Sequence, residues 1–155
     1  MSQFDRYLHA VITRAQREAR EDSSPTVEAQ HLLLAMSGEP DPVVEVLTSA
    51  GLDTAALRAA LEREFVESLS AVGVASSAYD LPKPSPRRDH PGIGTSAKLA
   101  LERGLSSSPR KKDLCPAHLL VGILSAEVGT VPRALSLAGV NRSDLLAHVR
   151  QTLGE

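Results

Sequence analysis

The sequence predicts an all-α protein in which eight helices form two four-helix repeats related by a pseudo-twofold axis. Apolar residues recur at helical spacing along most of the chain, and no alternating apolar run is long enough to indicate a strand. The 155 residues are 42% hydrophobic and 23% charged, with a net charge of −2. This length and composition suit one domain, residues 1–155, with a buried core, and they exclude disordered and collagen-like classes.

Repeat one is assigned to residues 1–70. Asp5 can cap the start of its first helix, because a short carboxylate accepts the free N–H groups of the first turn, and Asp53 can cap the fourth in the same way. The second helix is apolar most of the way round, which predicts that it is buried, and Gly38 ends it. The four helices are expected over residues 4–19, 31–36, 43–50 and 53–69.

Residues 71–94 differ from the rest of the chain because they are rich in proline and serine. Such a segment cannot hold a helix and is expected to be an exposed linker. Repeat two then covers residues 95–155. Pro116 suits the first turn of a helix, and Asn141 or Ser143 can cap the last one. Its four helices are expected over residues 95–105, 116–124, 131–138 and 143–153.

Two pairs of segments show the duplication directly. VEAQHLLLAM (27–36) matches LCPAHLLVGI (114–123), and LTSAGLDTAAL (47–57) matches LSLAGVNRSDL (135–145). His31 thereby corresponds to His118, and Gly51 corresponds to Gly139 at nearly the same spacing. A repeat that cannot bury its apolar face alone is stabilised by packing on its twin, so we expect the two copies to pack together.

The sequence also indicates a compartment. Cys115 is the one cysteine, so an internal disulfide is impossible. No stretch approaches the roughly 20 apolar residues that span a bilayer, and the charged N-terminus lacks the apolar segment of a signal peptide. We therefore expect a soluble, cytoplasmic protein with no membrane partner.

The order of several short motifs points to a family. Repeat one contains Phe4, AQREAR (15–20), the His-Leu-Leu-Leu run (31–34) and SAGLDTAALRAALE (49–62); repeat two contains His90, Ile93, AKLALE (97–102), AHLLVGIL (117–124) and LAGV (137–140). In this order and spacing they resemble the N-terminal double-repeat domain of Clp AAA+ unfoldases, most nearly the ClpC type. The resemblance covers nearly the whole chain and implies the Clp N-domain fold.

In that family the domain is tethered to ATPase modules, whereas this chain ends after repeat two. The nearest approach to a phosphate-binding loop is GIGTSAKL (92–99). It has Ala97 where glycine should precede the lysine, and Leu99 where serine or threonine should hold magnesium. We therefore expect a stand-alone domain that is not an enzyme, hydrolyses no ATP and needs no cofactor or metal.

The resemblance also implies a binding site. Clp N-domains bind adaptors and substrates, and some bind cyclic peptide natural products in a groove between the first helices of the two repeats. The matching positions are Phe4, Ile12 and Gln16 on one side, and His90, Ile93, Lys98, Glu102 and Leu105 on the other. The apolar residues supply contact area, while Lys98 and Gln16 can satisfy peptide carbonyls. In the alternative interpretation Ile12 and Leu105 are core, and Lys98 with Glu102 is a solvated pair.

This chain departs from the family at two kinds of position. Ile93 and Met1 stand where the family has aromatic anchors, so a shared ligand should bind more weakly here. Many ClpC-type domains recognise phosphorylated arginine through a Glu before each repeated His, but Gln30 and Ala117 occupy those positions. Neither offers the carboxylate that pairs with guanidinium, which argues against phosphoarginine as a ligand.

Other residues that could bind a metal, act in catalysis or bind nucleic acid have simpler interpretations. His31 and His118 lie at helix starts without a metal-ligand cluster, which favours hydrogen bonding within the helix packing. Cys115 has no base close in sequence, so an inert thiol is favoured over a hydrolase nucleophile. The basic clusters Arg87–Arg88 and Arg110–Lys112 are expected to be solvated surface in a net acidic protein.

The leading hypothesis is a non-catalytic peptide- and protein-binding module linked to the Clp unfoldase–protease system. Its expected partners are Clp components, adaptors or substrates, and cyclic peptides. It would act as an adaptor-like regulator, or as a decoy that lowers the free concentration of cyclic peptide antibiotics by mass action. The alternative is a DNA-associated regulatory protein that uses the basic loops.

Overall fold

The computed structural model describes residues 2–73 and 91–154, and in this part of the chain it contains eight α-helices. The helices are α1 (Gln3–Glu21), α2 (Ala29–Gly38), α3 (Val43–Ser49), α4 (Thr54–Ala71), α5 (Thr95–Ser106), α6 (Pro116–Leu124), α7 (Thr130–Leu137) and α8 (Arg142–Thr152). A 3₁₀-helix, η2 (Lys111–Asp113), and two short strands, β1 (Thr26–Val27) and β2 (Gly92–Ile93), accompany them. The predicted all-α fold is confirmed. Among the described helices, none combines the length and the hydropathy of a membrane-spanning segment.

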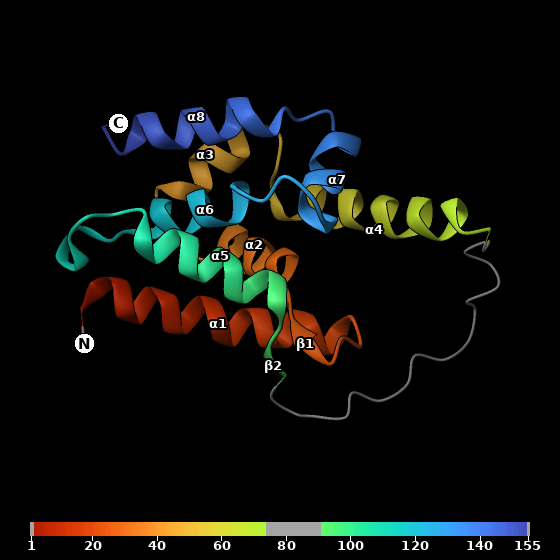
Figure 1. The fold of residues 1–155 in the computed structure, drawn as a ribbon, viewed down its shortest axis with the longest axis horizontal. Helices are drawn as coiled ribbons and strands as arrows, with labels where there is room; N and C mark the ends of the chain where they lie inside the picture. Colours follow the sequence, from red (N-terminus) through yellow and green to blue (C-terminus); the bar gives the residue numbers. More distant parts are fainter. Residues whose placement is uncertain (1, 74–90, 155) are drawn as a thin grey trace.

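Helices α2 and α6 form the centre of the molecule (Figure 1). In each of them seven residues are buried, as the apolar pattern of residues 31–36 predicts for α2. Helix α1 packs on α2 and α5 packs on α6, while α3 and α8 cover the opposite side of the central pair. The same local unit is therefore built twice, with one apolar helix enclosed by the others of its repeat and by the second repeat.

The repeats interlock where α4 of the first packs against α7 of the second. Glu64 on α4 is only 6% exposed, and its Oε1 accepts hydrogen bonds from Arg133 Nε at 2.9 Å and Ser68 Oγ at 2.8 Å. Arg63 Nη1 adds a bond of 2.9 Å to the carbonyl of Leu137. A buried carboxylate requires such partners, so Glu64 is compensated only while α4 and α7 stay packed together.

The helix caps test the sequence predictions one by one. Asp53 accepts from the N–H of Ala56 at 2.8 Å and Asn141 accepts from that of Asp144 at 3.0 Å, so both caps are confirmed. Asp5 is not the N-cap of α1. Ser2 is, because its Oγ accepts from Asp5 N at 3.1 Å while Asp5 Oδ2 accepts from Ser2 N at 3.0 Å. Asp5 lies inside the first turn, and its hydrogen bonds with Ser2 lower its pKa.

A parallel two-strand pair joins the repeats. Thr26 lies opposite Gly92 and Val27 opposite Ile93, and the N–H of Gly94 donates to the carbonyl of Val27 at 2.8 Å. The C-terminal end of the segment 71–94 therefore differs from the exposed linker expected, since Pro91 and Gly94 are buried. The pairing uses backbone groups alone, so side-chain periodicity contains no signal for it. Residues 74–90 of that segment lie outside the described residues.

Next to this strand pair, Glu28 and Ser96 bond to each other at the starts of α2 and α5. Ser96 Oγ accepts from the first N–H of α2, that of Ala29, at 2.8 Å and donates to Glu28 Oε1 at 2.7 Å. The same oxygen accepts the N–H of Ser96 at 3.3 Å. Burial opposes ionisation of Glu28, but hydrogen bonds from Thr26 and Ser96 outweigh it and lower the pKa of the carboxyl. We call this contact the Glu28–Ser96 junction.

Candidate functional site

Three of the predicted groove residues, Phe4, Ile12 and Gln16, lie on α1, and each is partly buried. Ile12 and Gln16 are four residues apart and share one face of the helix. Gln16 Nε2 donates to the carbonyl of Pro91 at 3.4 Å. Because Pro91 directly precedes β2, this contact places Gln16 close to the segment that contains Ile93.

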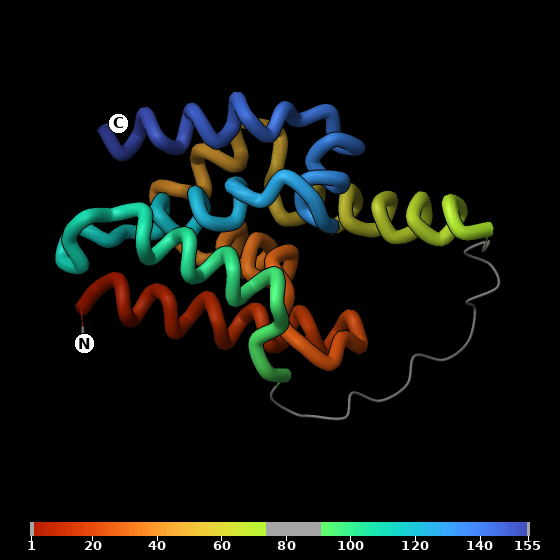
Figure 2. Tube along the Cα trace, in the orientation of Figure 1, coloured from red at the N-terminus to blue at the C-terminus, as the bar shows by residue number. Residues whose placement is uncertain are grey.

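The other predicted side lies on β2 and α5. Ile93 and Leu105 are each 42% exposed, so Leu105 is not a core residue. Lys98 and Glu102 are also exposed and share one flank of α5 with Leu105. Helices α1 and α5 run antiparallel (Figure 2), with the strand pair at one end (Figure 1). The groove as a whole stays a prediction, and His90 lies outside the described residues.

A cleft of about 420 Å³ lies on the opposite flank of α5, and we call it the α5 cleft. Leu99, which is 40% exposed, and Val128, which is 85% exposed, supply apolar surface, and Gln30 also lines it. Its charged lining residues are Glu28, Arg103, Glu127 and Arg133. The sequence pattern does not predict this cleft, because it indicates a loop over residues 125–129 but not that this loop lies beside α5. Helix α5 therefore presents a different surface on each flank.

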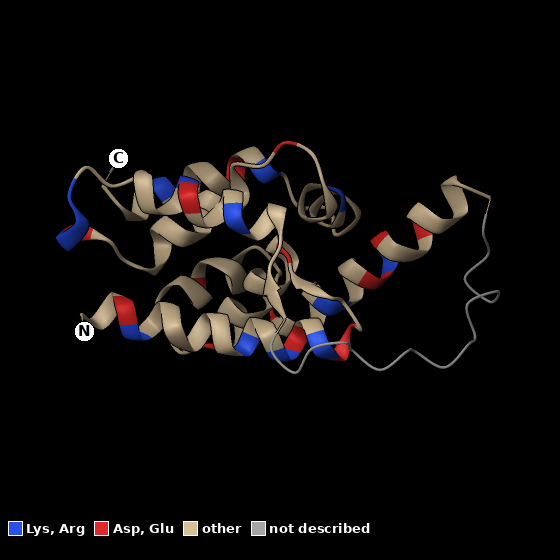
Figure 3. Ribbon diagram, turned by 60° about the horizontal axis from the view of Figure 1, so that its bottom comes forward, with Lys and Arg blue, Asp and Glu red and all other residues tan. Residues whose placement is uncertain are grey.

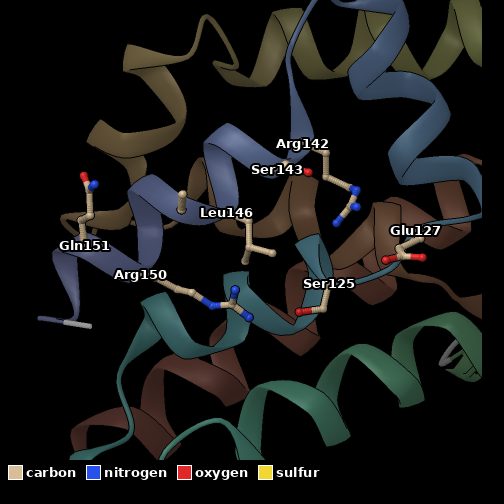
Figure 4. Close-up of a pocket in the computed structure, with 8 residues that line it drawn as sticks. Ser125, Glu127, Arg142, Ser143, Leu146, Arg150 and Gln151 are labelled. Carbon is tan, nitrogen blue, oxygen red and sulfur yellow. The ribbon is translucent and has the colours of Figure 1, made fainter.

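A second cleft, of about 620 Å³, lies between α8 and the segment after α6, and we call it the α8 cleft (Figure 4). Its lining residues are Ser125, Glu127, Arg142, Ser143, Leu146, Ala147, Arg150 and Gln151. None of these residues belongs to the predicted groove. The sequence motifs include single lining residues, such as Gln30 and Leu99 of the α5 cleft, but they do not predict either cleft, because each combines residues from segments far apart in the chain.

The two repeated histidines have a hydrogen-bonding role in the helix packing, as predicted. His31 is 1% and His118 is 7% exposed. Nδ1 of His31 accepts the N–H of Glu28 at 2.9 Å, and Nδ1 of His118 accepts that of Cys115 at 3.1 Å. When neutral, His31 therefore carries its proton on Nε2, which donates to Asp22 Oδ2 at 3.1 Å. Each imidazole thus caps the start of its own helix.

The remaining candidates are explained by local contacts. The expectation that Cys115 has no base close in sequence is wrong, because its Sγ lies 3.4 Å from Nδ1 of His118, three residues further on. That nitrogen already accepts the Cys115 backbone N–H. In residues 2–73 and 91–154, no group of three or more His, Cys, Asp or Glu could hold a metal ion.

The basic cluster Arg110–Lys112 forms a blue tip in Figure 3. Arg110 Nε pairs with Asp113 Oδ2 at 2.8 Å, and Lys111 contributes to the lowered pKa of Asp5. Nearby carboxylates therefore partly compensate this cluster, which weakens it as a phosphate-binding surface. The second cluster, Arg87–Arg88, lies outside the described residues.

Comparison with known proteins places this fold. The model of the Clp repeat (R) N-terminal domain matches residues 3–90, more than half of the chain. No curated protein sequence matches this chain. The N-terminal domain of the caseinolytic protease associated chaperone ClpD from Arabidopsis thaliana is similar in structure, with a TM-score of 0.64, 22% identity, and coverage of 94% of this chain and 93% of that one. Clp repeat domains are non-catalytic interaction modules of the Clp chaperone system. The chain belongs to the Clp repeat N-terminal domain family.

Proposed function

We propose that this chain binds peptides and protein partners of the Clp unfoldase–protease system. The observation that carries the proposal is the exposed apolar surface along β2 and α5. Of the six large hydrophobic side chains exposed in the described residues, three lie there, namely Ile93, Leu99 and Leu105. Contiguous exposed apolar area marks interaction surfaces. Leu105 lies on the flank of α5 that Lys98 shares, and Leu99 lines the α5 cleft on the other flank, so each flank of α5 offers apolar area.

Helix α5 is well placed to receive an extended peptide. Its inner face, Ala97, Ala100 and Gly104, is buried against α6, so both flanks remain accessible. Leu105 offers apolar area on the flank that Lys98 shares. Lys98 can donate to peptide carbonyls, and Gln16 keeps one amide N–H and its carbonyl oxygen for the peptide after bonding Pro91. Such polar groups orient a bound peptide, while the apolar contacts supply most of the affinity.

Such binding would allow two modes of action. As an adaptor-like regulator, the chain would share partners with the unfoldase and change how fast substrates are degraded. As a decoy, it would bind cyclic peptides that target the unfoldase and lower their free concentration in proportion to its own concentration and affinity. Both modes use the same surface, so the same variants test both.

The experiment is isothermal titration of the full chain with a cyclic peptide directed at Clp unfoldases. Leu105→Ser should weaken binding about three- to tenfold, because a ligand can bury the 42% of Leu105 that is exposed, and burial of a whole leucine side chain contributes about 1.5–3 kcal/mol. Val72→Ser is the matched control, since Val72 is 74% exposed but lies at the end of α4. It should leave the affinity unchanged.

The regulator mode is measured by adding the chain to a reconstituted Clp unfoldase–protease that degrades a fluorescent substrate. The degradation rate should change with wild type and Val72→Ser, and respond less to Leu105→Ser. No heat with the cyclic peptide at micromolar concentrations, together with an unaltered degradation rate, would contradict the proposal.

A further inference from the structure

Helix α8 presents an unusual row of side chains to the α8 cleft. Arg142, Leu146 and Arg150 follow one another at intervals of four residues, so they lie along one face of the helix, and all three line the cleft. In Figure 4 both guanidinium groups extend toward the space beside Leu146 and Ser125. Eight residues of α-helix rise about 12 Å, which separates the two arginine positions along the cleft.

The charges in this row are available to a ligand. Arg142 is partly buried, and its Nη1 donates to the carbonyl of Leu124 at 2.5 Å, which holds the side chain in place. Its other N–H groups have no partner among the described residues. Arg150 is exposed, and its side chain makes no hydrogen bond or ion pair with any described residue. Leu146 is partly buried between them, and Glu127 supplies one carboxylate to the lining.

The repeat architecture does not require these residues. In the repeat alignment Arg142, Leu146 and Arg150 correspond to Thr54, Arg58 and Glu62 of α4. Arg58 is engaged there by Glu18, through Nη1 to Oε2 at 2.8 Å and Nη2 to Oε1 at 2.6 Å. The first repeat thus satisfies its arginine internally, whereas the second has an apolar residue at that position and an arginine on either side.

We propose that the α8 cleft binds an acidic segment of a partner protein in extended conformation, with two carboxylates four residues apart and an apolar residue midway between them. In an extended chain alternate side chains share one face, and four residues span about 13 Å, close to the spacing of the two arginines. Each guanidinium pairs with a carboxylate, and the apolar side chain packs on Leu146.

A peptide fits this surface better than a nucleic acid does. Glu127 lies in the lining, and it disfavours a phosphate backbone with a charge at every nucleotide more than a peptide with two separated carboxylates. Leu146 gives the cleft apolar surface between the two arginines, which a peptide side chain can cover. Because α8 is separate from α1 and α5, the inference does not depend on the proposed function, and either can fail alone.

The test is fluorescence anisotropy with a labelled peptide containing Glu-Ala-Leu-Ala-Glu, and with a second peptide in which both Glu are Gln. Wild type should bind the first peptide, with affinity falling as salt rises, and not the second. Arg150→Gln should weaken binding at least about tenfold, as expected for the loss of one charge-assisted pair. Lys112→Gln removes the same charge from η2 and should leave the affinity within about twofold.

Arg142→Gln should weaken binding as well, but it also removes the bond to Leu124, so its thermal unfolding is compared with wild type. Arg150→Gln is decisive because its side chain has no described partner to lose. Several results would overturn the proposal: no binding at millimolar chain, equal binding of the two peptides, unchanged affinity in Arg150→Gln, or the same loss in Lys112→Gln. Displacement by single-stranded DNA at equal concentration would overturn it too.

Discussion

The replacement Gly122→Ala tests how closely α5 and α6 approach each other. A Cβ at residue 122 would lie 2.1 Å from the carbonyl oxygen of Ala100 and 2.6 Å from the backbone nitrogen of Gly104. Ordinary contact begins at 3.4 Å, so the two helices would have to separate by more than about 1 Å. Backbone atoms cannot rotate away as a side chain can, and the separation would loosen the packing of both helices.

Overpacking of this kind costs about 1–3 kcal/mol, and the upper part of that range applies because the clash is with backbone. For a chain of this length we expect the melting temperature to fall by about 4–12 °C. The assay is thermal unfolding followed by circular dichroism, with urea denaturation to obtain the free energy of unfolding. Intrinsic helix propensity acts in the opposite direction, since alanine stabilises a helix by up to about 1 kcal/mol relative to glycine.

Two further glycine variants test whether the loss of stability follows the closeness of the added Cβ to its neighbours. A Cβ on Gly104 would lie 2.9 Å from the carbonyl oxygen of His118 and 3.1 Å from Leu119 Cα, so Gly104→Ala should cost less than Gly122→Ala. Gly38→Ala is the control, because its nearest atom is the flexible guanidinium of Arg14 at 2.9 Å, and it should leave stability unchanged or raise it. If Gly122→Ala melts at or above the wild-type temperature, the close approach of α5 and α6 is refuted.

Three other expectations follow from polar groups. Tyr7→Phe should leave the free energy of unfolding, measured in urea, unchanged or raise it by up to about 1 kcal/mol. The reason is that the buried Tyr7 hydroxyl has no hydrogen-bond partner in the described structure. A loss above about 1 kcal/mol would contradict this. Because folding lowers the pKa of Glu28, its carboxylate stabilises the fold at pH values above the ordinary pKa of 4.5. This stabilisation is lost as the pH falls through the lower pKa of the folded state. The melting temperature should therefore fall less steeply between pH 5 and pH 3 in Glu28→Gln than in wild type, and parallel curves would exclude the effect. Arg133→Ala leaves the buried Glu64 carboxylate with Ser68 as its described donor, so the free energy of unfolding in urea should fall by about 1–3 kcal/mol. The fall should be smaller when Glu64→Gln is also present. Strictly additive losses would show that Arg133 and Glu64 are uncoupled.

Local features of this protein could be predicted because their causes are local. Apolar spacing places the helices, and Asp53 and Asn141 cap α4 and α8 through bonds that reach only three residues. The roles of His31 and His118 follow from the same short range, since each bonds its own N-cap. The error at Asp5 was also local, because Ser2 and Asp5 cap each other and the choice between two neighbouring polar residues depends on which one leaves the helix first.

The predicted groove is seen in the structure as the exposure and contacts of single residues. The sequence implied a groove from matching positions, and the structure gives the exposure of Ile93 and Leu105 and the contact of Gln16 with Pro91. The α5 and α8 clefts have no sequence signal, because their walls come from helices and loops that meet only when both repeats have folded.

The difference between local pattern and tertiary contact is clearest at one aligned pair. Ala35 in α2 and Gly122 in α6 occupy equivalent positions of the repeat, and helical periodicity treats them alike. Only the packed structure distinguishes them, because the backbone of α5 comes so close to Gly122 that a single methyl group does not fit. Strand pairing between Val27 and Ile93 and the Glu28–Ser96 junction belong to the same class. They join residues far apart in the chain through backbone and short side chains, and the folding of both repeats is what brings them together.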